Sequence, residues 1–235
     1  MKKFWGFLLV IVLMTSCGEY QSLLKSNDYN LVYKKAIEYY NKGDYQRAMN
    51  LLDGVRSVFV GQAKAQNIAY YRAFCSYNMK DYQIASDLFK QFIQTYPESS
   101  FAEECLYMMG FCDYKASPKP RLDQQVTEKA IREFQLYLSR YPYSMRKDKV
   151  NTYMDEMRDK LSYKAYLSAK NYYLREHYKA AVISLQNCLK DYPGSKYREE
   201  IMYMLFVSKY QMAVNSVEDK KVERYNNARE EYYYF

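Results

Sequence analysis

Residues 81–115, DYQIASDLFKQFIQTYPESSFAEECLYMMGFCDYK, decide the fold because part of this stretch recurs farther along the chain. When the register is shifted by 96 residues, 192–211 (YPGSKYREEIMYMLFVSKYQ) align with 96–115 at eight identical positions. Such self-similarity is typical of stacked supersecondary units, none of which buries its apolar face alone. The chain is therefore predicted to be built from repeats.

The first half of each repeat carries a tyrosine, a small residue three positions later and a second tyrosine four positions after that. The pattern occurs at Tyr33-Ala36-Tyr40, Tyr70-Ala73-Tyr77, Tyr107-Gly110-Tyr114, Tyr166-Ala169-Tyr173 and, with Phe206 in the small position, Tyr203-Tyr210. The first tyrosines are 37, 37, 59 and 37 residues apart. We therefore expect five repeats, with 22 extra residues beginning in the third.

The second half of each repeat has an aromatic residue, an alanine three positions later and further apolar residues before a Tyr-Pro. The best examples are Tyr82, Ala85, Phe89, Phe92 and Tyr96-Pro97, and then Tyr178, Ala181, Leu185, Cys188 and Tyr192-Pro193. Spacings of three and four place these residues on one helix face, and the proline ends the helix. Short polar breaks at 41–44 and 78–81 suit the connection of antiparallel helices. The predicted fold is an all-α tetratricopeptide-repeat solenoid of five helix-turn-helix units, or about ten helices.

The N-terminal segment predicts export and a lipid anchor. Residues 1–16 have two lysines before an apolar run of about half the roughly 20 residues that a membrane-spanning helix needs, which indicates a signal peptide. Small residues precede Cys17, as in the lipobox of bacterial lipoproteins, so Cys17 is the predicted lipidation site; the alternative is a secreted protein with a coincidental cysteine. Several acyl chains would anchor the protein stably. Gly18 follows in place of an inner-membrane retention signal, which favours the periplasmic face of the outer membrane.

The remaining chain divides into three parts. Residues 17–29 are interpreted as the lipidated cysteine and a short polar tether, and 30–144 as repeats 1–3, with an insertion at 116–126 that contains two prolines. Residues 145–235 are interpreted as a linker helix, which lengthens the first helix of repeat 4, followed by repeats 4 and 5. The sequence stops before the Tyr-Pro expected of repeat 5, so this repeat is interpreted as truncated or as a ragged end.

The paired tyrosines define a candidate binding groove. In the usual tetratricopeptide register they occupy the fifth and twelfth places of each first helix, which line the concave face, where further apolar residues join them. The predicted groove residues are Tyr33, Ile37, Tyr40, Tyr70, Phe74, Tyr77, Tyr107, Phe111 and Tyr114. Rigid aromatic faces with hydroxyl edges suit an extended peptide that carries aromatic residues. The alternative is that these tyrosines pack between helices.

Composition and motifs argue against catalysis and against nucleic-acid binding. The sequence has a single histidine, His177, and contains neither a nucleophile paired with a base, nor a metal-spaced cluster, nor a phosphate-binding glycine loop. We therefore expect no enzyme activity, cofactor or metal. The net charge of +8, or +6 without Lys2 and Lys3, is spread along the chain, which does not favour nucleic acid. Among the cysteines after Cys17, Cys75, Cys112 and Cys188 fall at repeat positions that tend to be inside and are expected to be buried thiols. Cys105 and Cys112 lie seven residues apart on one helix, too far to form a disulfide.

The order of these features resembles the BamD family of outer-membrane protein assembly lipoproteins. The resemblance is carried by the lipobox, the insertion in repeat 3, the linker KVNTYMDEMRDKLSYKAYLSAKNYY at 149–173 and the segment YKAAVISLQNCLKDYPGSKYREE at 178–200. The segment LDQQVTEKAIREFQLYLSRYPYS at 122–144 is especially similar to the family's third repeat. The resemblance covers about residues 30–215.

The resemblance implies a non-enzymatic subunit of the machine that inserts β-barrel proteins into the outer membrane. It implies that the first repeats receive the C-terminal signal strand of unfolded barrel proteins, and that later repeats dock on the periplasmic domains of the barrel-forming subunit BamA. Residues expected at that docking site are Tyr178, Lys179, Ser184 and Arg198, and Ser184 stands where relatives often have a basic residue. The competing hypothesis is an outer-membrane lipoprotein of the same architecture that binds glycan or cell wall by stacking tyrosines on sugar rings.

Overall fold

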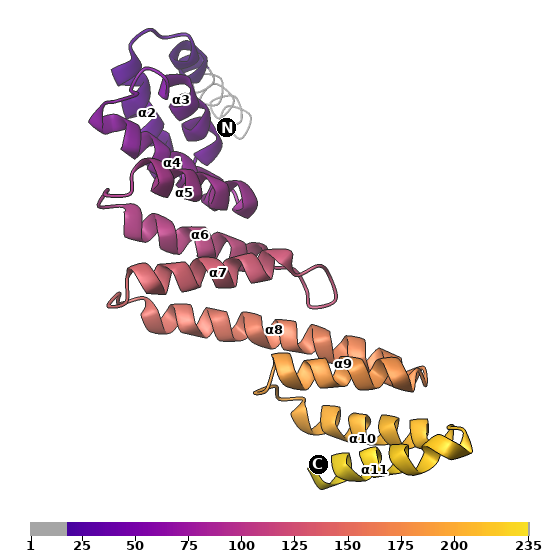
Figure 1. The fold of residues 1–235 in the computed structure, drawn as a ribbon. Coiled ribbons are helices and arrows are strands. Elements are labelled where there is room, and N and C mark those ends of the chain that lie inside the picture. Colours follow the sequence, from indigo (N-terminus) through magenta and orange to yellow (C-terminus); the bar gives the residue numbers. More distant parts are fainter. Residues whose placement is uncertain (1–17, 235) are drawn as a thin grey trace, which may run out of the picture. The chain divides into compact units, whose positions relative to one another are not determined.

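The computed structural model describes residues 18–234, in which every regular element is helical (Figure 1). A short helical stretch at 18–24 comes first. It is followed by α2 (Tyr29–Asn41), α3 (Tyr45–Val55), α4 (Ala63–Asn78), α5 (Tyr82–Thr95), α6 (Ala102–Ala116), α7 (Gln125–Arg140), α8 (Lys147–Leu174), α9 (Tyr178–Asp191), α10 (Arg198–Val214) and α11 (Glu218–Tyr234). Successive helices pair as hairpins, so the predicted all-α, tetratricopeptide-like fold is confirmed. The predicted signal peptide and Cys17 lie outside the described residues.

The chain divides into two compact units. The N-terminal unit comprises Met1–Ser117 and Lys129–Met145, and the C-terminal unit comprises Pro118–Glu128 and Arg146–Phe235. In the first, α2 packs on α3, α4 on α5, and α5 on α6; in the second, α8 packs on α9, α9 on α10, and α10 on α11. The two units are described separately below.

The core of each unit is a stripe in which alanines allow the paired helices to approach closely. The alanines of the second helices have no exposed surface. They are Ala48, Ala85, Ala130 and Ala181. In the N-terminal unit Leu51, Leu52 and Ile68 fill the space beside them, and in the C-terminal unit Leu185 and Ile201 do so. These four alanines of the repeat pattern are therefore core residues.

Residues 18–24 differ from the polar tether that their composition predicts. They are helical, Leu23 is only 6% exposed, and the ring of Tyr20 meets that of Tyr39 edge-on at 5.9 Å. The hydroxyl of Tyr20 accepts a hydrogen bond from Asn50 Nδ2 at 3.1 Å. Tyr20 and Leu23 are three residues apart and so share one helix face, which packs on α2 and α3 because it is apolar.

The first helix of the C-terminal unit's repeats, α8, is the longest of the described helices. Helix α8 runs without interruption for 28 residues. Its first half buries Val150, Met154 and Met157, which recur at spacings of four and three, and its second half buries Ala169 against α9 and α10. The apolar periodicity continues through the helix and explains why it does not break.

The turns within three hairpins share one conformation although their residues differ. Gly43, Lys80 and Glu176 all have positive φ, at 80°, 68° and 61°. In each turn the following N–H bonds to the carbonyl five residues earlier, for example Asp44 N to Tyr39 O at 2.9 Å and Asp81 N to Ser76 O at 3.0 Å. This is the Schellman end of a helix, which glycine adopts freely and which strains other residues.

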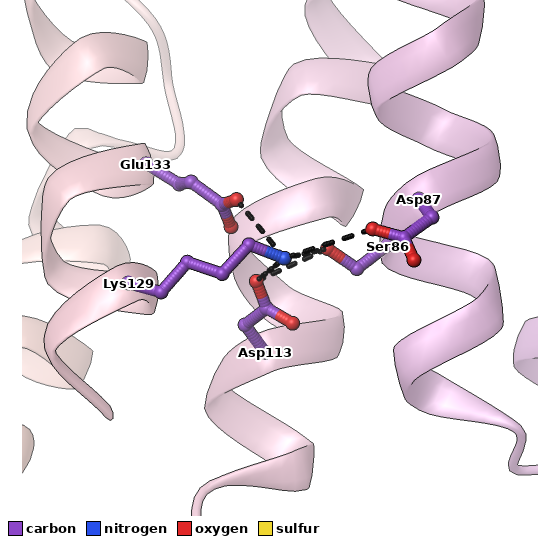
Figure 2. A network of polar contacts seen from close by, with 5 residues as sticks. All are labelled: Ser86, Asp87, Asp113, Lys129 and Glu133. Atoms are coloured by element: carbon purple, nitrogen blue, oxygen red, sulfur yellow. Dashed lines mark hydrogen bonds and ion pairs between the residues drawn. The ribbon is translucent and has the colours of Figure 1, made fainter. Parts of the chain in front are cut away.

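A buried network of charged side chains joins α5, α6 and α7 of the N-terminal unit. Figure 2 shows the ammonium of Lys129 between its partners: Nζ lies 2.8 Å from Asp113 Oδ2, 3.3 Å from Ser86 Oγ, 3.6 Å from Glu133 Oε1 and 3.9 Å from Asp87 Oδ1. Ser86 also donates to Asp113 at 3.1 Å. Asp113 is 1% exposed and Glu133 8% exposed. Two buried carboxyl groups therefore share one ammonium.

Glu133 is held protonated in this network. Burial, followed by the interaction with Asp113, raises the pKa of Glu133 from 4.5 to about 8, although Lys129 opposes the shift. Its Oε2 is buried and has no hydrogen-bond partner among the described residues. A neutral Glu133 leaves the carboxylate of Asp113, at 2.8 Å, and the exposed one of Asp87, at 3.9 Å, to balance the charge of Lys129.

We predict that Lys80→Gly stabilises the protein. A side chain in the left-handed region costs roughly 1–2 kcal/mol, which glycine relieves, while its larger unfolded-state entropy offsets part of the gain. The free energy of unfolding should rise by about 0.5–1 kcal/mol in urea denaturation. Lys42→Gly is the control, because Lys42 has an ordinary φ of −82° and glycine should lower stability there. A Lys80→Gly protein no more stable than the parent would contradict this assignment.

Stability should also fall as pH rises from about 4.5 to about 8. In this window the unfolded chain has released the proton of Glu133, whereas the folded protein retains it, so raising the pH favours unfolding. The free energy of unfolding falls by about 1.4 kcal/mol for each unit by which the pKa of Glu133 in the folded protein exceeds its pKa in the unfolded chain. Glu133→Gln stays neutral and should remove this fall, so the variant should gain stability relative to the parent toward pH 8. Glu98→Gln, at an exposed position, is the control. If the free energy of unfolding of the parent and of Glu133→Gln changed in parallel with pH, the protonated state of Glu133 in the folded protein would be refuted.

Candidate peptide-binding groove

The nine predicted groove residues lie on the first helices of repeats 1–3, which are α2, α4 and α6 of the N-terminal unit. Eight of them are partly exposed, and Tyr107 is buried with 7% of its surface exposed. Tyr107 therefore packs between helices, as the alternative interpretation expected of all nine residues. The other eight retain surface that a ligand can reach.

The aromatic residues of α4 form a continuous series of ring contacts. The centroids of Tyr70 and Phe74 are 4.5 Å apart, and those of Phe74 and Tyr77 are 6.4 Å apart. Tyr71 extends the series toward α2, because its ring meets Tyr70 at 5.5 Å and Tyr40 at 4.9 Å. Each ring limits the rotation of the next, which gives a surface with few rotors to freeze on binding.

The series continues onto α6. Tyr77 contacts Phe111 at 6.2 Å, and Phe111 lies between Tyr107 at 5.7 Å and Tyr114 at 5.9 Å. The planes of these two pairs differ by only 12° and 20°, so the three rings of α6 are stacked. The residues three and four apart along each helix thus meet as their spacing predicts.

A cavity of about 520 Å³ opens between α2, α4 and the start of α6. Three predicted residues line it, Tyr33, Ile37 and Tyr70, and so do residues that the sequence analysis did not identify: Lys34, Glu38, Asn41, Asn67, Tyr71 and Phe101. On α2 the lining positions are 33, 34, 37, 38 and 41. This helix face is rotated by one residue from the face that carries the tyrosines. Its polar residues, Lys34, Glu38 and Asn41, therefore do not belong to the apolar periodicity from which the groove was predicted.

Tyr70 is the best-supported side chain of this cavity. Its hydroxyl donates to Glu104 Oε2 at 2.8 Å, and its ring lies 4.6 Å from that of Phe101. Burial, then the hydrogen bond to Glu104, raises the pKa of Tyr70, so the hydroxyl stays neutral. The cavity combines aromatic walls with amides, one cation and one carboxylate, which are groups that can contact side chains and bond to an extended backbone.

The predicted docking residues lie in the C-terminal unit, and the structure brings two of the four together. Tyr178 and Lys179 line a cavity of about 760 Å³ formed by α9, α10 and the start of α11. Arg224 lines it too and donates to Ser216 Oγ at 2.5 Å. The other two are elsewhere in the unit: Ser184 lies partly exposed on α9, and Arg198 is exposed at the first position of α10.

The remaining candidates for chemistry have structural positions. Cys75, Cys112 and Cys188 are buried free thiols, as expected, and Cys105 is a buried free thiol as well. Burial raises the pKa of Cys75 to about 12, which keeps it a poor nucleophile. His177 is exposed at the N-cap of α9. No group of three or more potential ligands that could hold a metal ion occurs within residues 18–234. In the same range, no helix is sufficiently long and apolar to cross a membrane.

Comparison with protein families agrees with this architecture. The model of the YfiO family, described as an outer membrane lipoprotein, matches residues 25–225. The match covers all of α2 to α10 and part of α11. No curated protein matches the chain.

Proposed function

Since the chain belongs to the YfiO family of outer membrane lipoproteins, we propose that it serves in the machine that assembles β-barrel proteins in that membrane. In this role the protein is not an enzyme. Its N-terminal unit binds unfolded barrel proteins as extended peptides, and its C-terminal unit docks on the periplasmic domains of the barrel-forming subunit BamA.

The observation that carries the client-binding role is the cavity of the N-terminal unit. Its volume of about 520 Å³ admits one or two side chains, and the ring contacts that continue from it along α4 and α6 provide a longer aromatic surface. Lys34 and Asn67 at its edge offer donors to backbone carbonyls. An extended strand with aromatic side chains satisfies both features.

The membrane attachment and the docking site are parts of the same proposal. Lipidation of Cys17 would hold the folded units at the periplasmic face of the outer membrane, where barrel proteins arrive. On the C-terminal unit, Tyr178, Lys179 and Arg224 present an aromatic ring and two cations at one cavity. An acidic or hydrogen-bonding surface of the partner's periplasmic domains would complement them.

One observation favours the competing function of glycan or cell-wall binding. A sugar site combines aromatic faces with amides and carboxylates, and Glu38, Asn41 and Asn67 supply these groups beside Tyr33 and Tyr70. The two functions make different demands on the ligand, so binding assays can separate them.

The assembly role predicts a stoichiometric partner. We expect the tagged lipoprotein, recovered from detergent-solubilised outer membranes, to bring with it a barrel protein that has repeated periplasmic domains, identified by mass spectrometry. Lys179→Glu should reduce the yield of this partner, because it reverses a charge at the docking cavity, whereas Lys190→Glu on the same helix should not. Recovery of the protein alone, or with envelope glycan, would refute the assembly role.

The groove assignment predicts that Asn41→Trp weakens peptide binding at least tenfold, or by about 1.4 kcal/mol. Asn41 is exposed and lines the cavity, so the indole should fill the cavity without disturbing the core. Binding is measured by fluorescence anisotropy with a labelled ten-residue peptide from the C-terminal strand of a barrel protein, and with labelled cell-wall glycan fragments. Lys42→Trp, one residue outside the lining, is the control. Unchanged peptide affinity in a folded Asn41→Trp protein would exclude this cavity, and glycan binding alone would favour the competing function.

A further inference from the structure

We infer that the C-terminal unit contains a second peptide-binding site, built around Tyr166, Tyr197 and Glu200, which takes an aromatic side chain together with a neighbouring carboxylate. The class of ligand rests on the function proposed for the N-terminal cavity. The site itself rests on the hydrogen bond, the ring contacts and the cavity of the C-terminal unit.

The internal repeat places the same three-residue arrangement in both units. The shift of 96 residues that relates 96–115 to 192–211 also carries Tyr70, Phe101 and Glu104 onto Tyr166, Tyr197 and Glu200. Tyr166 Oη donates to Glu200 Oε2 at 2.7 Å, where Tyr70 donates to Glu104 at 2.8 Å. The rings of Tyr166 and Tyr197 are 4.4 Å apart, where those of Tyr70 and Phe101 are 4.6 Å apart.

A cavity accompanies the arrangement in each unit. The one in the C-terminal unit has a volume of about 420 Å³, against about 520 Å³ in the N-terminal unit. The positions of α8 that line it recur at spacings of three and four, as one face of a helix does. They are Tyr163, Tyr166, Leu167, Lys170, Asn171 and Leu174. The cavity is therefore a feature of the repeat and not of one local irregularity.

Three nearly parallel rings form one wall of this cavity. The plane of Tyr197 differs by 11° from that of Tyr166 and by 29° from that of Tyr163, and Tyr163 and Tyr166 differ by 20°. Tyr166 is buried, whereas Tyr163 and Tyr197 are partly exposed. Offset stacking is a favoured arrangement of aromatic rings, so an aromatic side chain of a ligand can extend this stack.

Lys170 places a cation directly against the Tyr-Glu pair of the second site, where the first site has Phe74. It occupies the position of Phe74 in the repeat register, and its Nζ donates to Tyr166 Oη at 2.8 Å and to Glu200 Oε1 at 2.7 Å. The hydrogen bond to Glu200, then that to Tyr166, raises the pKa of Lys170, so the ammonium is charged at neutral pH. An ammonium has three N–H donors, and two are used. The third can bind a carboxylate next to the aromatic side chain.

Isothermal titration of the full lipoprotein in detergent tests the inference. The probe is a synthetic ten-residue peptide that contains one Tyr-Asp step among serine and threonine. We expect two peptides to bind each protein. Asn171→Trp should reduce the number to one by filling the second cavity, Asn41→Trp should reduce it to one by filling the first, and the double variant should bind none. Ser168→Trp, exposed on α8 but outside the lining, is the matched control.

The variants separate the two proposals. Binding of one peptide that Asn41→Trp abolishes and Asn171→Trp leaves unchanged would overturn the second site and leave the proposed function standing. Binding of one peptide that Asn171→Trp abolishes and Asn41→Trp leaves unchanged would support the second site and overturn the first. Binding that neither variant affects, or no binding, would overturn both. In the Asn41→Trp protein, whose first cavity is filled, replacing Tyr-Asp by Tyr-Asn should weaken binding at the second site at least threefold, and Lys170→Met should remove that difference. Equal affinities of Asn41→Trp for the two peptides would refute the role of Lys170.

Discussion

The close crossing of paired helices at small residues is the constraint on which the rest of each unit depends. Ala36, Ala73 and Ala169 of the first helices have no exposed surface, and the alanines of the second helices are equally buried. The limit is clearest at Gly110, where an added Cβ would lie 2.9 Å from the ring of Phe134. Interiors are close-packed, so a larger residue at such a position displaces a whole helix. The tyrosines three before and four after each small residue flank this crossing. Tyr107 and Tyr166 are buried beside it, whereas Tyr33, Tyr40, Tyr70, Tyr77, Tyr114 and Tyr173 remain partly exposed.

This constraint explains how far the sequence could predict the structure. The helix pairs, the crossing alanines and the continuation of α8 all follow from periodic small or apolar residues, because packing requires those residues at those positions. The helix at 18–24 did not follow, since Tyr20 and Leu23 are too few to define a period within a polar segment. The polar lining of the N-terminal cavity was missed for a related reason. Asn41 and Asn67 line a cavity, so no packing requirement marks them in the sequence.

The buried charges of the N-terminal unit act on specificity more than on net stability. Removing the carboxyl groups of Asp113 and Glu133 and part of the Lys129 side chain from water costs free energy, which their attraction only partly repays. Sliding α7 by one residue would separate Lys129, whose side chain is 36% exposed, from Asp113 and leave the buried Asp113 carboxylate without its ammonium partner. The apolar contacts of Ala130 and Phe134 would tolerate several similar packings of α7, whereas the network permits one. The protonated state of Glu133 limits the excess of negative charge in this arrangement.

The two cavities show how a repeat protein can hold sites that are alike in construction and different in selectivity. The Tyr-Glu hydrogen bond and the ring at 4.4–4.6 Å are common to both, because they connect successive repeats and are needed for packing. The residue one turn along the helix differs between them. Phe74 extends an aromatic surface and packs on the buried Phe89, whereas Lys170 brings a charged donor to Tyr166 and Glu200. Other lining positions differ too, for example Asn67 and Tyr163. Under the proposed roles, a client strand with an aromatic residue would suit either site, and an adjacent carboxylate would add to its binding at the second. Selectivity among clients would then arise from the residues that vary around a shared Tyr-Glu pair.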